Sequence, residues 1–209
     1  RSQVGMVFQN PDNQIIGTSV EEDVAFGPEN KNIEPEKIRK IVETVLRKVK
    51  LWDRRKALPS RLSGGQKQRL ATADALAGLP ACLVLDEPTA MLDPDSRKEV
   101  INIVKELNRK EGMTIILITH HTDEVVDADR IVLMKDGKII GDDIPKKIFA
   151  DYELLKKAKM DIPPVVELGM RLEKQQIGLE GPVLQEQEMI EKIVKLYRSK
   201  CGGKKDAAR

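Results

Sequence analysis

The sequence predicts an α/β fold, because helix-like and strand-like segments alternate along most of its 209 residues. Apolar side chains recur at helical spacing within residues 34–50. Residues 81–85 and 114–119 are instead short, continuous apolar runs, a pattern typical of strands that are buried on both faces. We therefore expect a sheet whose two faces are both covered.

The first predicted element is a strand-like run at residues 4–8. It starts without the turn or cap that usually precedes a core element, and we interpret this start as a cut end. The turn-rich residues 10–14 separate it from the amphipathic helix at 34–50. A second helix is expected from Gly64 to about Ala77.

The alternation continues with the strand at 81–85, a charged helix near 96–109 and the strand at 114–119. Gly112 stands between this helix and the last strand as a stop signal, since glycine readily adopts the left-handed conformation that ends helices. The β-branched residues of 114–119 favour a strand.

Two further short strands are expected at residues 131–134 and 138–140. They are joined by Asp136-Gly137, a dipeptide typical of hairpin turns, and are expected to complete the sheet. We therefore assign residues 1–150 to one domain, with a helical subdomain at about 30–78.

A small C-terminal helical region is expected over residues 151–200. Pro163-Pro164 breaks the chain, and helical stretches follow near 165–175 and 185–198. Residues 201–209 lack apolar periodicity and are expected to be disordered.

Composition excludes several classes of partner. The 36 Lys and Arg residues balance 34 Asp and Glu residues, so the net charge of +2 offers no reason to propose nucleic acid as a partner. Cys82 and Cys201 lie far apart, which favours a reducing, cytoplasmic compartment without disulfides. The longest apolar runs are far shorter than the roughly 20 residues of a membrane helix. Any membrane contact is therefore expected to come through a partner.

The pentapeptide Leu62-Ser63-Gly64-Gly65-Gln66 precedes the second predicted helix. Ser63 suits the N-cap position, and the two glycines allow close approach of a ligand to the backbone. The N–H groups and helix dipole at such an end favour a bound phosphate. The alternative is an ordinary capped helix, but the full pentapeptide followed by Lys67-Gln68-Arg69 favours a ligand site.

Asp86 and Glu87 directly follow the apolar run at 81–85, at the sheet edge where open α/β folds bind ligands. We expect Asp86 to hold Mg²⁺, through water, and Glu87 to orient the attacking water or accept its proton in phosphoryl transfer. The alternative is a surface acid pair that caps a turn before Pro88.

Three further residues are candidates by position. Gln9 ends the first apolar run, and its uncharged amide suits Mg²⁺ or a water molecule. His120 follows the strand at 114–119 and is preferred over His121, which is expected to be an exposed neighbour. Asp93 suits a turn or a helix cap ahead of Ser96, so its functional interpretation depends on the family.

The motifs FQNP, LSGGQ, LVLDEP, MLDP and ITHH occur in an order that resembles the nucleotide-binding domain of ABC transporters, over residues 1–141. The resemblance implies a P-loop NTPase-like ABC ATPase fold with an α-helical signature subdomain, and binding of ATP with Mg²⁺. It also implies a head-to-tail dimer with a second ABC ATPase subunit. The roles implied are Q-loop for Gln9, signature for residues 63–66, Walker B for Asp86 and Glu87, D-loop for Asp93, and switch histidine for His120.

More narrowly, VFQNPDNQ, VEEDVAFGPEN, TAMLDP and THHTDE resemble the ATPases of energy-coupling factor importers, which take up vitamins and metal ions such as cobalt. This implies transmembrane partner subunits and a peripheral location at the cytoplasmic face of the membrane. Residues 21–23 and Phe26 would then lie near the groove for a coupling helix. The alternative is a solvated helix start.

The sequence departs from the family because GxxxxGK[ST], the Walker A loop, occurs nowhere in it. We therefore expect a fragment without the N-terminal strands, with an unpaired sheet edge, weak ATP binding and no turnover on its own. Two alternatives remain open at this point: a soluble ABC ATPase of DNA repair or translation, and a truncated, non-catalytic partner subunit.

Overall fold

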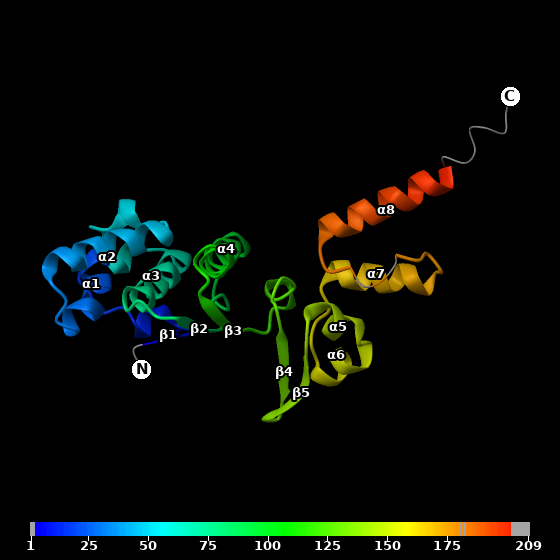
Figure 1. The fold of residues 1–209 in the computed structure, drawn as a ribbon, viewed down its shortest axis with the longest axis horizontal. Coiled ribbons are helices and arrows are strands. Elements are labelled where there is room, and N and C mark those ends of the chain that lie inside the picture. The colour runs from blue at the N-terminus through cyan, green and yellow to red at the C-terminus, as the bar shows by residue number, and fades with distance from the viewer. Residues whose placement is uncertain (1–2, 180, 182, 202–209) are drawn as a thin grey trace. The chain divides into compact units, whose positions relative to one another are not determined.

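The computed structural model describes residues 3–179, 181 and 183–201. The chain forms two compact units, the first ending at Thr119 and the second beginning at His120 (Figure 1). Each unit has its own hydrophobic core and is described by itself.

The centre of the first unit is a three-stranded parallel sheet in the order β1 (Val4–Val7), β2 (Cys82–Asp86) and β3 (Thr114–Ile118). Leu85 of β2 is paired with Val7 on one side and with Leu117 on the other. Because all three strands run in the same direction, their carboxyl ends meet at one edge, and the segments that follow them share that edge.

The helices of this unit are α1 (Val20–Asn30), α2 (Pro35–Lys48), α3 (Gly64–Ala77) and α4 (Pro94–Glu111). The first three pack against one another, and α3 also contacts β1 and α4 (Figure 1). Short 3₁₀ helices lie at Pro11–Asn13, Trp52–Arg54 and Pro59–Arg61. The helices predicted at 34–50, 64–77 and 96–109 are therefore present as α2, α3 and α4, within a few residues at each end.

The ends of α4 show why its prediction succeeded. Asp93 is the N-cap residue, and Pro94 occupies the first turn, where its missing N–H has no partner to lose. Gly112 ends the helix with φ of 67°, a left-handed conformation that glycine adopts at little cost.

One face of the parallel sheet is covered by helices and the other is exposed, so the expectation that both faces are covered is wrong for these strands. Leu83 and Leu85 point to the covered face and are fully buried. On the opposite face, four apolar side chains are 42–53% exposed, those of Val4, Met6, Ile116 and Ile118, while Val84 between them is partly buried. A run of apolar residues shows that both faces are apolar, but not what covers each face.

β1 is an edge strand of this sheet, and part of its outer edge is occupied by a side chain. The Gln14 amide donates to the Met6 carbonyl (3.2 Å) and accepts from the Phe8 N–H (3.2 Å). These backbone groups point away from β2, because the N–H and C=O groups of successive residues in a strand point to opposite sides. The Gln3 carbonyl accepts from the Cys82 N–H, so the odd-numbered residues of this strand face β2, and Met6 and Phe8 do not. Among the described residues no strand pairs with this outer edge, as expected, and the Gln14 side chain caps part of it.

The second unit contains an antiparallel hairpin, β4 (Ile131–Lys135) and β5 (Lys138–Asp143), with α5 (Pro145–Ala150), α6 (Tyr152–Ala158), α7 (Pro164–Lys174) and α8 (Glu186–Cys201). A further short 3₁₀ helix lies at Thr122–Glu124. The hairpin turn is Asp136-Gly137, as predicted, with φ of 49° and 73°.

This hairpin is a separate two-stranded sheet, so the expectation that it completes the parallel sheet is wrong. Its apolar side chains pack with those of the following helices: Ile131 and Leu133 share a core with Ile148, Phe149 and Leu155. The hairpin belongs with the C-terminal helices for this reason. The boundary between the compact units consequently lies at 119/120, whereas we expected a domain boundary at 150/151.

The C-terminal helices include α7 and α8 close to their predicted positions, whereas α5 and α6 were not predicted. Both unpredicted helices are only 6 or 7 residues long, too short for a clear apolar period. Residue 201 ends α8, and residues 202–209, where disorder was expected, lie outside the described residues. Among the helices described, none has the length and apolar character needed to cross a membrane.

Candidate functional site

Two of the predicted site residues are in direct contact at the carboxyl edge of the parallel sheet. Gln9 follows β1, and Glu87 follows β2. The Gln9 Nε2 group donates a hydrogen bond to Glu87 Oε2 at 2.9 Å. The two residues are 78 positions apart, so only the parallel pairing of β1 with β2 brings them together.

Glu87 has an unusual backbone conformation. Its φ of 45° lies in the left-handed region, which non-glycine residues seldom occupy. Its N–H donates to the Ile118 carbonyl at the end of β3 (2.8 Å), and its own carbonyl accepts from Ala90 (3.2 Å). The strand pairing therefore continues one residue past Asp86, and it holds the Glu87 backbone in a conformation that costs free energy.

Asp86 is the last residue of β2 and is partly buried. In the described part of the chain, no three His, Cys, Asp or Glu side chains gather closely enough to hold a metal ion. Asp86 and the Gln9 amide nevertheless supply oxygen ligands, the type that Mg²⁺ prefers. Mg²⁺ commonly keeps several water ligands and binds substrate phosphates, so a sparse set of protein oxygens at this edge fits it.

The start of α3 carries a capping box. The Ser63 Oγ accepts from the Gln66 N–H (3.3 Å), and the Gln66 side chain accepts from the Ser63 N–H (3.0 Å). This reciprocal pairing explains why the helix begins at Gly64. It also leaves the N–H groups of Gly64 and Gly65 as the first-turn donors next to the positive end of the helix dipole.

The two signature glycines differ in what surrounds them. A Cβ atom on Gly65 would lie 2.7 Å from the Ser96 side chain, so this glycine is required by the packing of α3 against α4. A Cβ on Gly64 would meet only Leu92, at an ordinary 3.5 Å. Close approach of the backbone to a ligand, the reason predicted for both glycines, therefore stays a prediction for Gly64 and is not the only explanation for Gly65.

The three residues after the pentapeptide connect α3 to the rest of the unit, a role that the sequence analysis did not assign. Lys67 forms an ion pair with Asp12 (2.7 Å), and the Gln68 amide donates to the Phe8 carbonyl (3.4 Å). Both contacts reach the segment that carries Gln9.

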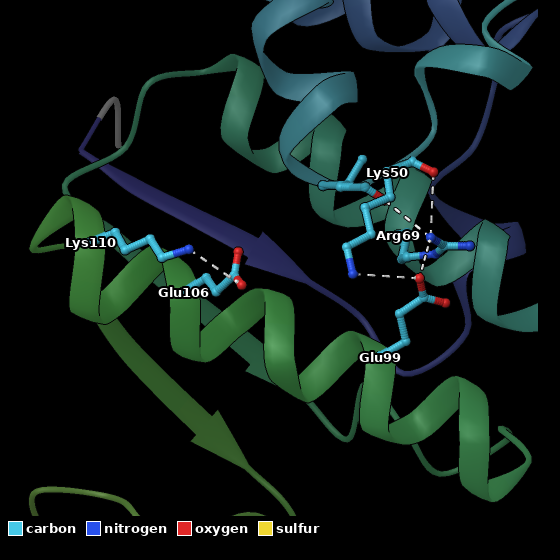
Figure 2. Close-up of polar contacts among 6 residues, drawn as sticks. Lys50, Arg69, Glu99, Glu106 and Lys110 are labelled. Atoms are coloured by element: carbon cyan, nitrogen blue, oxygen red, sulfur yellow. Dashed lines mark hydrogen bonds and ion pairs between the residues drawn. The ribbon is translucent and has the colours of Figure 1, made fainter.

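The side chain of Arg69, which belongs to α3, is buried against the end of α2 and against α4, as Figure 2 shows. Its Nη1 donates to the Val49 carbonyl (3.3 Å) and forms an ion pair with Glu99 (3.0 Å). Lys50 Nζ lies 4.0 Å from the same Glu99 oxygen. Arg69 therefore balances the charge of Glu99 and joins α3 to the end of α2. It serves the packing of the protein and is not a ligand-binding cation.

Asp93, the residue with two interpretations, is a helix cap in this structure. Its Oδ1 accepts from the N–H groups of Asp95 (3.1 Å) and Ser96 (3.0 Å). The hydrogen bonds from Ser96, first from its side chain and then from its backbone, hold the pKa of the Asp93 carboxyl below its usual value.

His120 is the first residue of the second unit and is exposed. His121 is partly buried and not the exposed neighbour expected, and the centroids of the two rings are 4.2 Å apart. His120 lies just past the end of β3, because Ile118 is the last residue of that strand and only Thr119 stands between them. The role of His120 stays a prediction.

The acidic residues 21–23 divide into two groups. Glu21 forms an ion pair with Lys56, and Glu22 accepts a hydrogen bond from Thr18, both at the surface. Asp23 is instead only 4% exposed, so a solvated helix start does not describe it, whereas the expected nearness of these residues to a coupling-helix groove stays a prediction.

A small cleft within the first unit is lined by residues of four of the motifs. It is formed by the segment after β1, the start of α3 and the segment after Glu87. Its lining residues are Gln9, Asn10, Pro11, Asp12, Gly64, Lys67, Gln68, Pro88, Met91 and Leu92. Gln9 and Gly64 therefore share one cleft, while Gln9 also contacts Glu87.

Comparison with known proteins identifies the family. Residues 1–90 match the family model described as ABC transporter. The energy-coupling factor transporter ATP-binding protein EcfA1 of Caldanaerobacter subterraneus subsp. tengcongensis is 54% identical over 193 residues, which are 92% of this chain and 70% of that protein. This chain belongs to the energy-coupling factor ATPases. EcfA1 of Clostridium novyi is 50% identical over 94% of this chain and 70% of that protein.

Solved structures agree with this family. The structure of cbiO1 from Clostridium perfringens, described as part of the ABC transporter complex cbiONQ, matches with a TM-score of 0.70 and 37% identity. The match covers 83% of this chain and 68% of that chain. The dimeric ATP-binding cassette MJ0796, bound to ADP and Pi, matches with a TM-score of 0.59 and 30% identity over 68% and 63% of the two chains. The ABC ATPase fold predicted from the motifs is confirmed.

The predicted site residues of this energy-coupling factor ATPase belong to different compact units of the chain. Gln9, Glu87 and the start of α3 meet in the first unit through the contact and the cleft described above. Asp86 lies at the same strand end, whereas His120 belongs to the second unit.

Proposed function

We propose that this chain takes part in the binding of ATP with Mg²⁺ at the carboxyl edge of its parallel sheet, and in its hydrolysis, together with a Walker A loop that these 209 residues do not contain. The hydrolysis would drive the import of a vitamin or metal ion. The hydrogen bond between Gln9 and Glu87 carries this proposal. It joins an amide and a carboxylate from two strand ends, where phosphoryl-transfer sites place groups that orient water and bind the metal.

Glu87 is the general base of this proposal. Its carboxylate would accept a proton from the attacking water, and the Gln9 amide would hold that carboxylate in position. The left-handed backbone of Glu87, fixed by the Ile118 carbonyl, supports this role because strain of this kind is concentrated at functional sites. His120 would donate a hydrogen bond to the γ-phosphate or the attacking water.

Asp86 and the carbonyl oxygen of the Gln9 amide would hold Mg²⁺, Asp86 through water. When bound, Mg²⁺ neutralises phosphate charge. The protein supplies few oxygen ligands here, so binding of the metal would depend on the nucleotide.

The signature would act on a nucleotide held by a second subunit. The N–H groups of Gly64 and Gly65 and the positive end of α3 suit a phosphate, and Asp93 would belong to the same dimer interface. The dimeric state of MJ0796 supports a dimer for this chain.

Transmembrane subunits are the remaining proposed partners. The cbiO1 relative is described as part of a transporter complex, which supports an assembly of this kind. The proposed location is therefore peripheral, at the cytoplasmic face of the membrane.

The substitution Glu87→Gln in the complete gene product tests the proposal. We expect ATP turnover to be lost while ATP still stabilises the dimer, because the amide keeps the shape of the side chain but accepts no proton. Turnover is measured by phosphate release and dimerisation by light scattering with Mg²⁺ and ATP.

Glu106→Gln is the matched control, since Glu106 is an exposed acid of α4 that pairs only with Lys110 among the described contacts. This control should keep wild-type turnover. Hydrolysis that survives Glu87→Gln would show that Glu87 is not the base.

A further inference from the structure

Asp23 and Asp74 form a buried carboxyl pair between α1 and α3. Asp23 is 4% exposed, and both oxygens of the Asp74 carboxyl group are buried. Among the described residues, neither oxygen of Asp74 nor Asp23 Oδ2 has a hydrogen-bond partner, and the two carboxyl groups interact electrostatically. Two interacting carboxylates repel, and burial makes a second negative charge more costly, so one of the two groups is expected to hold a proton.

The surrounding donors decide which group holds it. Asp23 Oδ1 accepts hydrogen bonds from the Ile16 N–H (2.8 Å) and the Gly17 N–H (2.6 Å), which stabilise its ionised form. In the described part of the chain, Asp74 receives no such donors, and Asp23 is the only charge that acts on it. Burial first, and the charge of Asp23 second, raise the pKa of Asp74 to about 9.

The acids beside Asp23 do not compete for this position. Glu21 is paired with Lys56 and Glu22 with Thr18. The carboxyl group that α3 places next to Asp23 is that of Asp74. The loop of residues 15–17 places two backbone N–H groups next to Asp23, those of Ile16 and Gly17. Asp23 Oδ2 and both Asp74 oxygens are buried and have no hydrogen-bond partner among the described residues, and a proton on Asp74 would supply Asp23 Oδ2 with a donor.

The loop held by Asp23 is the end of the segment that begins with Gln9. This loop packs closely on α1, since a Cβ on Gly17 would lie 2.5 Å from the Asp23 backbone nitrogen. The start of the same segment is tied to α3 by the Lys67–Asp12 ion pair and by Gln68. The signature helix thus holds the segment at both ends, and Asp74 reaches the far end through Asp23.

We propose that Asp23 and Asp74 share one proton and act as a positioning pair, which fixes the segment of residues 9–17 relative to the signature helix α3. Neither residue touches the reacting groups. Any effect of the pair on turnover rests on the proposed function, but the pair and its tether can be measured without activity.

The first measurement is the titration of the aspartate Cγ chemical shifts in the full chain by carbon-13 NMR. We expect Asp74 to stay protonated at neutral pH and to titrate near pH 9. Titration of Asp74 below pH 6 would overturn the proposal.

The second measurement is hydrogen exchange of the Ile16 and Gly17 amides at pH 7. In Asp74→Asn the amide still donates to Asp23, so exchange should stay within about twofold of the wild type. In Asp74→Leu the donor is lost, and exchange should be about tenfold faster. Glu36→Gln, at an exposed position of α2, is the control and should leave both amides unchanged.

Equal exchange rates in Asp74→Asn and Asp74→Leu would contradict the proposal, because the donated hydrogen bond would then be irrelevant. If Asp74→Leu does not fold, the carboxyl titration and Asp74→Asn decide alone. In the complete gene product, wild-type ATPase activity should fall as the pH rises through about 9, and Asp74→Asn should remove this fall. If the complete gene product has no ATPase activity, the proposed function is wrong. The NMR titration and the hydrogen exchange rates would still test the pair of Asp23 and Asp74.

Discussion

At the scale of single residues, Glu87 and Asp74 are both held in states that they would not adopt in an unfolded chain. The left-handed backbone of Glu87 costs on the order of 1 kcal/mol or more, and pairing with β3 maintains it. Asp74 keeps a proton at neutral pH because of burial and the neighbouring charge of Asp23. In both cases residues distant in the sequence impose the state.

The protonation of Asp74 predicts how stability depends on pH. The folded-state pKa of about 9 lies above the ordinary 3.8, so between these values the folded chain keeps a proton that the unfolded chain releases. The contribution of Asp74 to the free energy of unfolding is therefore fully present below about pH 4 and declines as the pH rises towards 9, by at most about 1.4 kcal/mol per pH unit.

The Asp74→Asn variant lacks this carboxyl group. Its free energy of unfolding should therefore rise relative to that of the wild type as the pH increases from about 4 towards 9. The difference between the two proteins should level off above about pH 9. Urea unfolding at pH 5 to 9 measures the difference. Asp53→Asn, which removes an exposed acid, tests whether the loss of a negative charge is enough to change the pH dependence. Parallel wild-type and Asp74→Asn curves would exclude a protonated Asp74.

At the scale of elements, the start of α3 combines a local signal with a tertiary one. The capping box of Ser63 and Gln66 involves only neighbouring residues, so the sequence could predict this helix end. The contact of Gly65 with Ser96 depends on how α3 packs against α4, and spacing alone does not reveal it.

The two glycines allow a direct comparison. Gly65→Ala should destabilise the chain by about 1–3 kcal/mol, since the new methyl group would overlap with Ser96 and the helices would have to shift. Gly64→Ala should change stability little, because its methyl group has ordinary space next to Leu92. Chemical denaturation of the two variants checks this difference. Equal losses would mean that the N-terminus of α3 is not packed as described.

At the scale of the whole molecule, the chain carries the sequences that we assign to the Q-loop, signature and Walker B motifs, but no Walker A sequence. The backbone N–H groups and lysine of that loop are main ligands of the β- and γ-phosphates in P-loop proteins. A polypeptide of these 209 residues alone should therefore show weak ATP binding and no Mg²⁺-dependent hydrolysis.

Calorimetry with ATP and a phosphate-release assay test this prediction on the purified polypeptide. A complete energy-coupling factor ATPase, assayed in parallel, provides the positive control. Robust turnover by the 209 residues would show that another group binds the phosphates.

Much of the fold follows from local pattern. The regular spacing of α2, the caps of α3 and α4, and the Asp136-Gly137 turn are set by residues close in the chain, and the structure contains each of them. The separate hairpin was not predicted, because nothing local to residues 131–143 shows that their apolar side chains pack with α5 and α6. The short α5 and α6 were missed for lack of a clear period.

The sequence by itself determined the family and the candidate residues, since order and type of residue carry a motif without any knowledge of packing. Only the tertiary structure decided the contact of Gln9 with Glu87, the internal role of Arg69 and the burial of Asp23 against Asp74. Each joins residues from different elements, and the free energy of such a contact depends on distance and burial, which residue type alone does not specify.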